Sequence, residues 1–143
     1  MPIKLTYLAH ETPGTARVSL TDECALLENR AMRCSWQRSD GSLTELRIEN
    51  LHTSQVVDVD NGFLPQVVLG SGRIIDMCDC SLTLRVEADA LMASCDDEPS
   101  GLSISLSVSL DDEMNAVIQT LRVTASRDTA ISNLHFFNTV LPG

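Results

Sequence analysis

Two short acidic runs contain the first side chains in the sequence that could do chemistry. Residues 96–98 and residues 111–113 both read Asp-Asp-Glu, and carboxylates gathered in a loop are the ligands that calcium prefers. The nine residues 102–110 lie between the runs and, as an extended strand, would separate them by roughly 30 Å. The two runs therefore do not share one ion. We expect solvated acidic turns, with calcium binding by either run as the alternative.

The cysteines stand at positions 24, 34, 78, 80 and 95. An odd number at irregular spacing does not predict a disulfide framework, so we expect reduced and mostly buried thiols. Cys78 and Cys80 look like half of a metal site, but paired zinc ligands are separated by two to four residues and a second pair is missing. Cys95 or Cys34 could approach in space as a further ligand, but in a strand Cys78 and Cys80 share a face, which favours two buried core thiols.

Histidine, serine and glycine do not assemble into a catalytic pattern. His10, His52 and His135 lie outside any nucleophile or metal motif, and no G-x-S-x-G segment supports a hydrolytic serine. We expect His135 on the outer face of the last strand. Residues 70–72, Gly-Ser-Gly, are followed by no helix pattern, so they predict a turn and not a phosphate-binding loop.

Aromatic side chains make up only 3 % of the chain, and they are Tyr7, Trp36, Phe63, Phe136 and Phe137. Trp36 would share a strand face with Met32 and Cys34, which predicts a core position. No two aromatics are therefore expected to form a stacking platform for sugars. A sugar site would depend on polar side chains such as Asn61, Gln66, Asn133 and Asn138. Such hydrogen bonds gain only about 0.5–1.5 kcal/mol each, which predicts millimolar or weaker affinity.

The composition excludes several classes of function. The 143 residues fit a single domain, residues 1–143. Twenty acidic and ten basic side chains give a net charge of −10, which repels nucleic acid and anionic membranes. No apolar run approaches the roughly 20 residues that cross a bilayer, and the start lacks the pattern of a signal peptide. These features predict a soluble, cytoplasmic protein.

Apolar and polar residues alternate with period two through most of the chain, which predicts an all-β fold. The clearest case is residues 102–110, where five apolar side chains share one face and four serines share the other. Further strands are predicted at residues 31–37, 43–49, 55–59, 66–69, 73–77, 82–87, 116–125 and 130–140. Residues 22–29 and 89–95 are candidate short helices, although 88–93 fit a strand equally well. Turns are predicted at residues 39–42, 70–72, 98–101 and 126–128 from their glycine, aspartate, serine and proline residues. Strands joined by such short turns predict an antiparallel β-sandwich of two sheets, with a barrel as the alternative.

Several segments share the pattern of a known β domain. An opening hairpin is formed by residues 27–36, 39–46 and 48–50, around an Asp-Gly turn, and a later strand pair by residues 114–125 and 130–134. Together these segments resemble the galactose-mutarotase-like β-supersandwich at the N-terminus of many glycoside hydrolases, α-galactosidase-like enzymes among them. In those enzymes the catalytic carboxylates lie in a following barrel, so the resemblance assigns no catalytic residue to this chain.

The resemblance implies a non-catalytic accessory domain that packs against a barrel, shapes a substrate cleft or makes oligomer contacts, with residues 139–143 leading toward the barrel. The alternatives are a stand-alone carbohydrate-binding module, a small structural or interaction protein of an unrelated family and a small independent enzyme. The enzyme is disfavoured because no nucleophile, base or metal constellation emerges. We therefore assign no catalytic, cofactor-binding or metal-binding residue. Because the edge strands of a sandwich must be covered, we predict self-association, or docking to another domain, through an apolar surface.

Overall fold

The computed structural model describes residues 13–39, 41–59, 64–114 and 116–135. Within them the first sheet contains β1 (Arg17–Leu20), β2 (Cys24–Glu28), β3 (Met32–Ser39), β4 (Ser42–Asn50) and β5 (Val56–Val59). The second sheet contains β8 (Thr83–Glu87), β9 (Ala90–Asp97), β10 (Leu102–Leu110) and β11 (Val117–Ala125). The third sheet contains β6 (Gln66–Leu69), β7 (Ile74–Asp76) and β12 (Ile131–His135). Apart from one 3-10 turn, Met77–Asp79, no helix occurs among the described residues.

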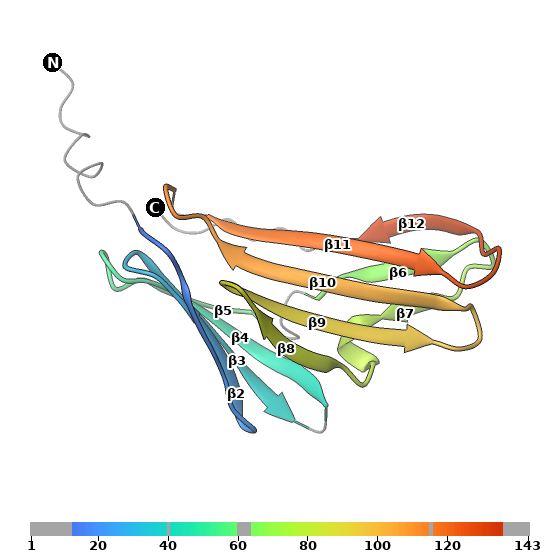
Figure 1. Cartoon of the computed structure of the whole chain (residues 1–143), viewed down its shortest axis with the longest axis horizontal. Coiled ribbons are helices and arrows are strands. Elements are labelled where there is room, and N and C mark those ends of the chain that lie inside the picture. The colour runs from blue at the N-terminus through green and yellow to red at the C-terminus, as the bar shows by residue number, and fades with distance from the viewer. Residues whose placement is uncertain (1–12, 40, 60–63, 115, 136–143) are drawn as a thin grey trace, which may run out of the picture.

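All the paired strands run antiparallel, in the orders β1-β2-β3-β4-β5, β11-β10-β9-β8 and β12-β6-β7. In Figure 1 the β8–β11 sheet runs the length of the molecule, with the β1–β5 sheet toward one end and β6, β7 and β12 toward the other. The prediction of an all-β antiparallel sandwich is confirmed. Three sheets replace the expected two because the chain turns after β11 and pairs β12 with β6.

One apolar core joins the three sheets. Strand β10 illustrates its origin, because its five apolar side chains are at most 4 % exposed while its serines point to the other face. On β3, Met32, Cys34 and Trp36 share the buried face as predicted, with exposed fractions of 1 %, 0 % and 1 %. Each such buried side chain contributes roughly 1.5–3 kcal/mol by leaving water.

The prediction of short helices at residues 22–29 and 89–95 is wrong. Residues 22–29 contain β2, which pairs with β1 on one side and β3 on the other, and residues 89–95 lie almost wholly in β9, between β8 and β10. Pairing on both sides satisfies the backbone of these segments and outweighs their weak helical pattern. Strand β1 was missed because only four residues of moderate strand propensity form it.

The segment around Cys78 also differs from the prediction. Strand β7 ends at Asp76, whose carboxylate accepts a hydrogen bond from the backbone N–H of Cys78 at 2.9 Å and caps the 3-10 turn. Cys78 and Cys80 are therefore half-buried at a turn and do not share a strand face. A short polar side chain that captures a nearby N–H competes with strand pairing, and here it ends the strand.

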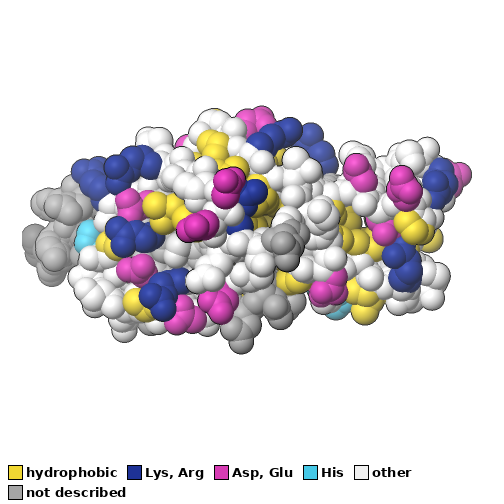
Figure 2. All heavy atoms as spheres, turned by 90° about the horizontal axis from the view of Figure 1, so that it is seen from below, with side chains coloured by type: hydrophobic (Ala, Val, Ile, Leu, Met, Phe, Trp, Pro, Cys, Tyr) yellow, Lys and Arg dark blue, Asp and Glu magenta, His cyan; other side chains and the backbone are white. Residues whose placement is uncertain are grey.

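The surface carries its charge in a dispersed form. Figure 2 shows acidic and basic side chains interspersed over one face, with hydrophobic side chains exposed between them. The large exposed hydrophobic residues include Ile74 on β7, Ile118 on β11, and Ile131 and Leu134 on β12. No helix in the described part of the chain has the length and apolar character needed to span a membrane.

Candidate functional site

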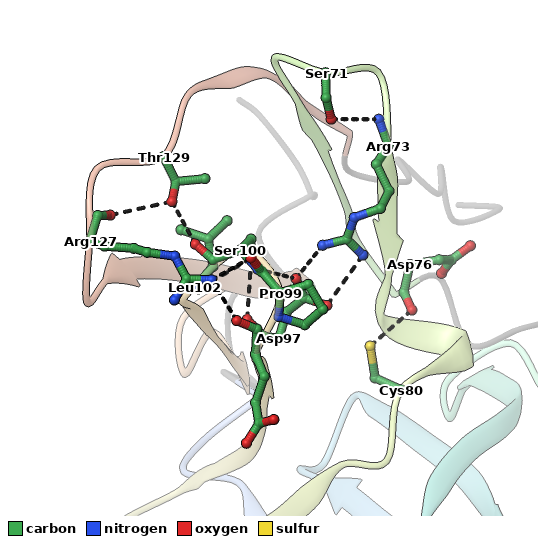
Figure 3. A network of polar contacts seen from close by, with 11 residues as sticks. Ser71, Arg73, Asp76, Cys80, Asp97, Pro99, Ser100, Leu102, Arg127 and Thr129 are labelled. Carbon is green, nitrogen blue, oxygen red and sulfur yellow. Dashed lines mark hydrogen bonds and ion pairs between the residues drawn. The ribbon is translucent and has the colours of Figure 1, made fainter.

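Three turns that are far apart in the sequence meet at one end of the molecule (Figure 3). They are the β6–β7 turn (residues 70–73), the β9–β10 turn (residues 98–101) and the β11–β12 turn (residues 126–130). We call this region the turn-end site. Arg73 bonds to Asp97 at the end of β9, and side chains of the β11–β12 turn bond to carbonyls of the β9–β10 turn, so polar contacts fix the geometry of the site.

Asp97, the last residue of β9, is the central acceptor of the site. Its two carboxylate oxygens accept from the guanidinium of Arg73, one of them at 3.3 Å, and Oδ2 also accepts from the backbone N–H of Ser100 at 3.1 Å. The Asp97 side chain is only 16 % exposed, against 44 % for Arg73. The hydrogen bond from Arg73 is the main reason that the pKa of Asp97 lies below its ordinary value of 3.8.

The β9–β10 turn closes around a buried serine. Ser100 is 6 % exposed, and its hydroxyl accepts from the backbone N–H of Leu102 at 3.2 Å. Gly101 has a φ of +76°, and a Cβ there would lie 2.8 Å from the hydroxyl oxygen of Ser126. Both the backbone angle and the space therefore require glycine at this position.

The β11–β12 turn is fastened to the β9–β10 turn by side chains. Arg127 donates to the carbonyl of Glu98 at 2.6 Å and to the carbonyl of Pro99. Thr129 donates its hydroxyl proton to the carbonyl of Ser100 at 2.6 Å. Carbonyls that a tight turn leaves without partners are thus satisfied by the neighbouring turn.

These contacts surround an open pocket of about 460 Å³. It is lined by Asp96, Asp97, Glu98, Gly101, Leu102, Ser103, Ser126 and Arg127. Three of these side chains already have partners. Asp97 pairs with Arg73, and Arg127 donates to backbone carbonyls. Asp96 accepts a hydrogen bond from the hydroxyl of Ser103 at 2.7 Å. The exposed side chain of Glu98 also borders the pocket, so the polar part of its surface offers carboxylate oxygens and hydroxyls to a ligand.

The two acidic runs lie at opposite ends of β10, as predicted from their spacing. The first run belongs to the turn-end site. In the second, Asp111 caps its own turn by accepting from the N–H groups of Glu113 and Met114 at 2.7 and 2.9 Å. Among the described residues no group of three or more His, Cys, Asp or Glu side chains is placed to hold a metal ion.

Two of the polar side chains considered for sugar binding lie among the described residues, on the paired strands β6 and β12. Gln66 on β6 donates its amide to Asp76 at 2.7 Å, and Asn133 lies exposed on β12. Asn61 and Asn138 lie outside the described residues. His135 is exposed at the end of β12 and His52 is exposed in a turn, whereas His10 falls outside the described range.

The cysteines differ sharply in their surroundings. Burial raises the pKa of Cys34 and Cys95 to about 12, and it is also the main cause of the rise for Cys78, to about 12, and for Cys80. Cys80 and Cys95 lie within reach of a thiol–thiol hydrogen bond, so Cys95 does approach the 78–80 segment in space. Cys24, at the start of β2, is exposed.

Native-state alkylation is expected to modify Cys24 first. The thiolate is the reactive form, and the raised pKa values of the other four thiols keep them protonated at pH 8. Iodoacetamide should label one thiol rapidly, and mass spectrometry of digested protein would locate it. Full labelling of all five should require denaturant. A rapid phase that persists in Cys24→Ser would contradict this assignment.

A small apolar cavity lies inside the core, away from the turn-end site. Its walls include Trp36, Leu91, Leu106 and the side chain of Gln119 on β11. The amide nitrogen of Gln119 is buried and has no hydrogen-bond partner among the described residues. With apolar walls the cavity offers no second partner to a water molecule, so we assign it no ligand.

Comparison with protein-family models, with curated proteins and with solved structures finds no significant match. The resemblance to the glycoside-hydrolase supersandwich therefore stays a prediction. Sequence reasoning placed residues 98–101 and 126–128 in turns but did not bring them together. Nor did it find the Arg73–Asp97 pair, whose members are 24 positions apart.

Proposed function

We propose that this chain is a non-catalytic accessory module of a carbohydrate-active protein and that its turn-end site contacts hydroxyl groups of the carbohydrate. The pocket of about 460 Å³ is the observation that carries the proposal. Its carboxylates, hydroxyls and backbone groups are the partners that sugar hydroxyls use. The polar contacts between the three turns hold these groups in place before a ligand arrives, which lowers the ordering cost of binding.

The chemistry of the pocket supports contact rather than catalysis. A carboxyl group that acts as a general acid in glycoside hydrolysis needs a raised pKa. The pKa of Asp97 is shifted in the opposite direction by its hydrogen bond with Arg73. Asp97 thus serves as a fixed anionic partner of an arginine. Ser126 donates its hydroxyl proton to the carbonyl of Gly101 at 3.1 Å and keeps only its acceptor side for a ligand, so Glu98 is the carboxylate left to meet one.

The lining of the pocket also supports weak binding. No aromatic side chain lines the pocket, and Leu102 is only 1 % exposed, so the pocket offers no ring on which the face of a sugar could stack. Net gains of about 0.5–1.5 kcal/mol per hydrogen bond predict a dissociation constant near or above 1 mM. Such affinity suits a module that acts beside a catalytic domain and does not capture the substrate alone.

Titration of ¹⁵N-labelled protein with galactose- and glucose-containing oligosaccharides tests the proposal. We expect amide shifts at residues 96–103 and 126–127 that saturate in the millimolar range. Glu98→Gln should weaken binding several-fold, because an amide offers one acceptor where the carboxylate offers two. Glu113→Gln, in the acidic turn at the other end of β10, is the matched control and should bind as the wild type does.

Two outcomes would contradict the proposal. Shifts that avoid the turn-end site at 50 mM sugar would exclude it as the contact surface. Saturation in the low micromolar range would instead support the stand-alone carbohydrate-binding module, whose affinity must suffice without a catalytic partner.

A further inference from the structure

Cys80 and Cys95 are two thiols that the fold brings together from positions 15 apart in the sequence. Cys95 is buried on β9, and Cys80 lies half-buried directly after the 3-10 turn. In the β8–β9 hairpin Thr83 is opposite Ser94, so the residues just before β8 pass beside Cys95. The register of the hairpin therefore holds the two thiols close to each other.

Hydrogen bonds direct the two sulfur atoms of this pair toward each other. The Cys80 thiol donates its proton to the carbonyl of Asp76 at 3.3 Å (Figure 3). The Cys80 sulfur in turn accepts from Cys95 in the thiol–thiol hydrogen bond. A disulfide joins cysteines whose side chains already face each other at short range, and this pair meets that requirement.

Cys78 is the neighbouring thiol, and its partners are different. Its thiol bonds to the carboxylate of Asp76 and to the backbone of Leu64, and its backbone N–H donates to the same carboxylate. A disulfide between Cys78 and Cys80 would have to break these bonds. The other two cysteines belong to the β1–β5 sheet. Among the five cysteines, Cys80 and Cys95 are therefore the pair that is placed to react.

We propose that Cys80 and Cys95 form a reversible disulfide when the protein meets a small-molecule disulfide such as oxidised glutathione. One cysteine sulfur attacks oxidised glutathione, forms a mixed disulfide with it and releases one glutathione. The second cysteine sulfur then attacks the first and releases the other glutathione. The protein gives up two electrons and two thiol protons, which are recovered in the two glutathione thiols. The proposal goes beyond sugar contact and does not depend on it.

Cys80 is the sulfur that we expect to react first. The thiolate is the attacking form. Burial raises the pKa of Cys80, but the hydrogen bond from Cys95 acts against this rise. Cys95 is more deeply buried, and its pKa is raised to about 12. Because both thiols are mostly protonated near neutral pH, the exchange should be slow and take minutes to hours.

The disulfide would change the stability of the fold around the turn-end site. It would close residues 80–95 into a covalent loop that contains β8 and most of β9. Closing a loop of this length restricts the unfolded chain and should raise the melting temperature by about 5–15 °C. Cys95 lies two residues before Asp97, so the bond would also anchor the strand end that carries the central acceptor of the site.

Oxidation of Cys24→Ser protein in glutathione buffers tests the proposal, since this variant lacks the exposed thiol that would link two copies. After acid quenching and alkylation, a protease that cuts at Asp79 separates Cys78 from Cys80. Mass spectrometry should then find a cross-linked peptide pair that contains Cys80 and Cys95 and has lost two hydrogens. The cross-link should disappear when the protein is returned to a reducing buffer.

Matched variants assign the bond to its two cysteines. Cys78→Ser should keep both the cross-link and the rise in melting temperature, whereas Cys80→Ser and Cys95→Ala should lose both. Each variant is compared with itself in reducing and oxidising buffer, so a stability loss from the substitution does not affect the result. A Cys78–Cys80 cross-link, glutathione adducts without a cross-link, or a rise that persists in Cys80→Ser would overturn the proposal.

Discussion

Trp36→Ala is expected to lower the free energy of unfolding by about 3–5 kcal/mol. The indole is 1 % exposed and lies between the sheets, where it lines the small internal cavity with Leu91 and Leu106. Its removal would enlarge that cavity, and the surrounding strands cannot close it without disturbing their pairing. Urea denaturation followed by circular dichroism would measure the change, because the variant lacks the only tryptophan of the chain.

Trp36→Phe is the control for this prediction. It keeps an apolar ring in the same place and should cost clearly less than Trp36→Ala. Equal losses in the two variants would show that the packed volume of the indole is not what stabilises this part of the core.

Asp97→Asn is expected to lower the free energy of unfolding at pH 7 by about 1–2 kcal/mol. The variant loses the charged hydrogen bonds from Arg73 and weakens the bond from the Ser100 N–H. Solvent around the half-exposed Arg73 keeps the loss small. Arg73→Gln, which removes the donor, should also lower the stability.

The pH dependence of this effect has a definite sign. Because the pKa of Asp97 in the folded protein is lowered below 3.8, its contribution is fully present above that value. The contribution is lost as the pH falls through the folded-state pKa. The stability difference between wild type and Asp97→Asn should therefore shrink on acidification below pH 4. A difference that stays constant from pH 7 to pH 2 would contradict the ion pair.

The strands could be predicted where the alternation of side chains matches burial. The bounds predicted for residues 66–69 and 102–110 are those of β6 and β10. The alternation predicts these bounds because one face of each strand is buried and the other is polar or half-exposed. It failed at β2, where buried residues follow one another at Leu27 and Glu28, and the latter is held by ion pairs with Arg17 and Arg33.

The turn-end site could not be predicted in the same way. Each turn was visible in the sequence from its glycine, proline, serine or aspartate residues. Their meeting depends on β12 crossing to pair with β6, a long-range contact that leaves no local pattern. The Arg73–Asp97 pair joins two different sheets across 24 positions and likewise leaves no local pattern, so the pocket was not found.

The pairing of β12 with β6 has a consequence for how the chain assembles. The first five strands form successive hairpins, so each strand can pair with the preceding one after closure of only a short loop. Joining Ile131 to Leu69 instead requires the whole of residues 70–130 to be brought into a loop, at a larger entropic cost. The folding nucleus is therefore expected among the local hairpins. The turn-end site forms only after the loop of residues 70–130 has been closed by the pairing of β12 with β6.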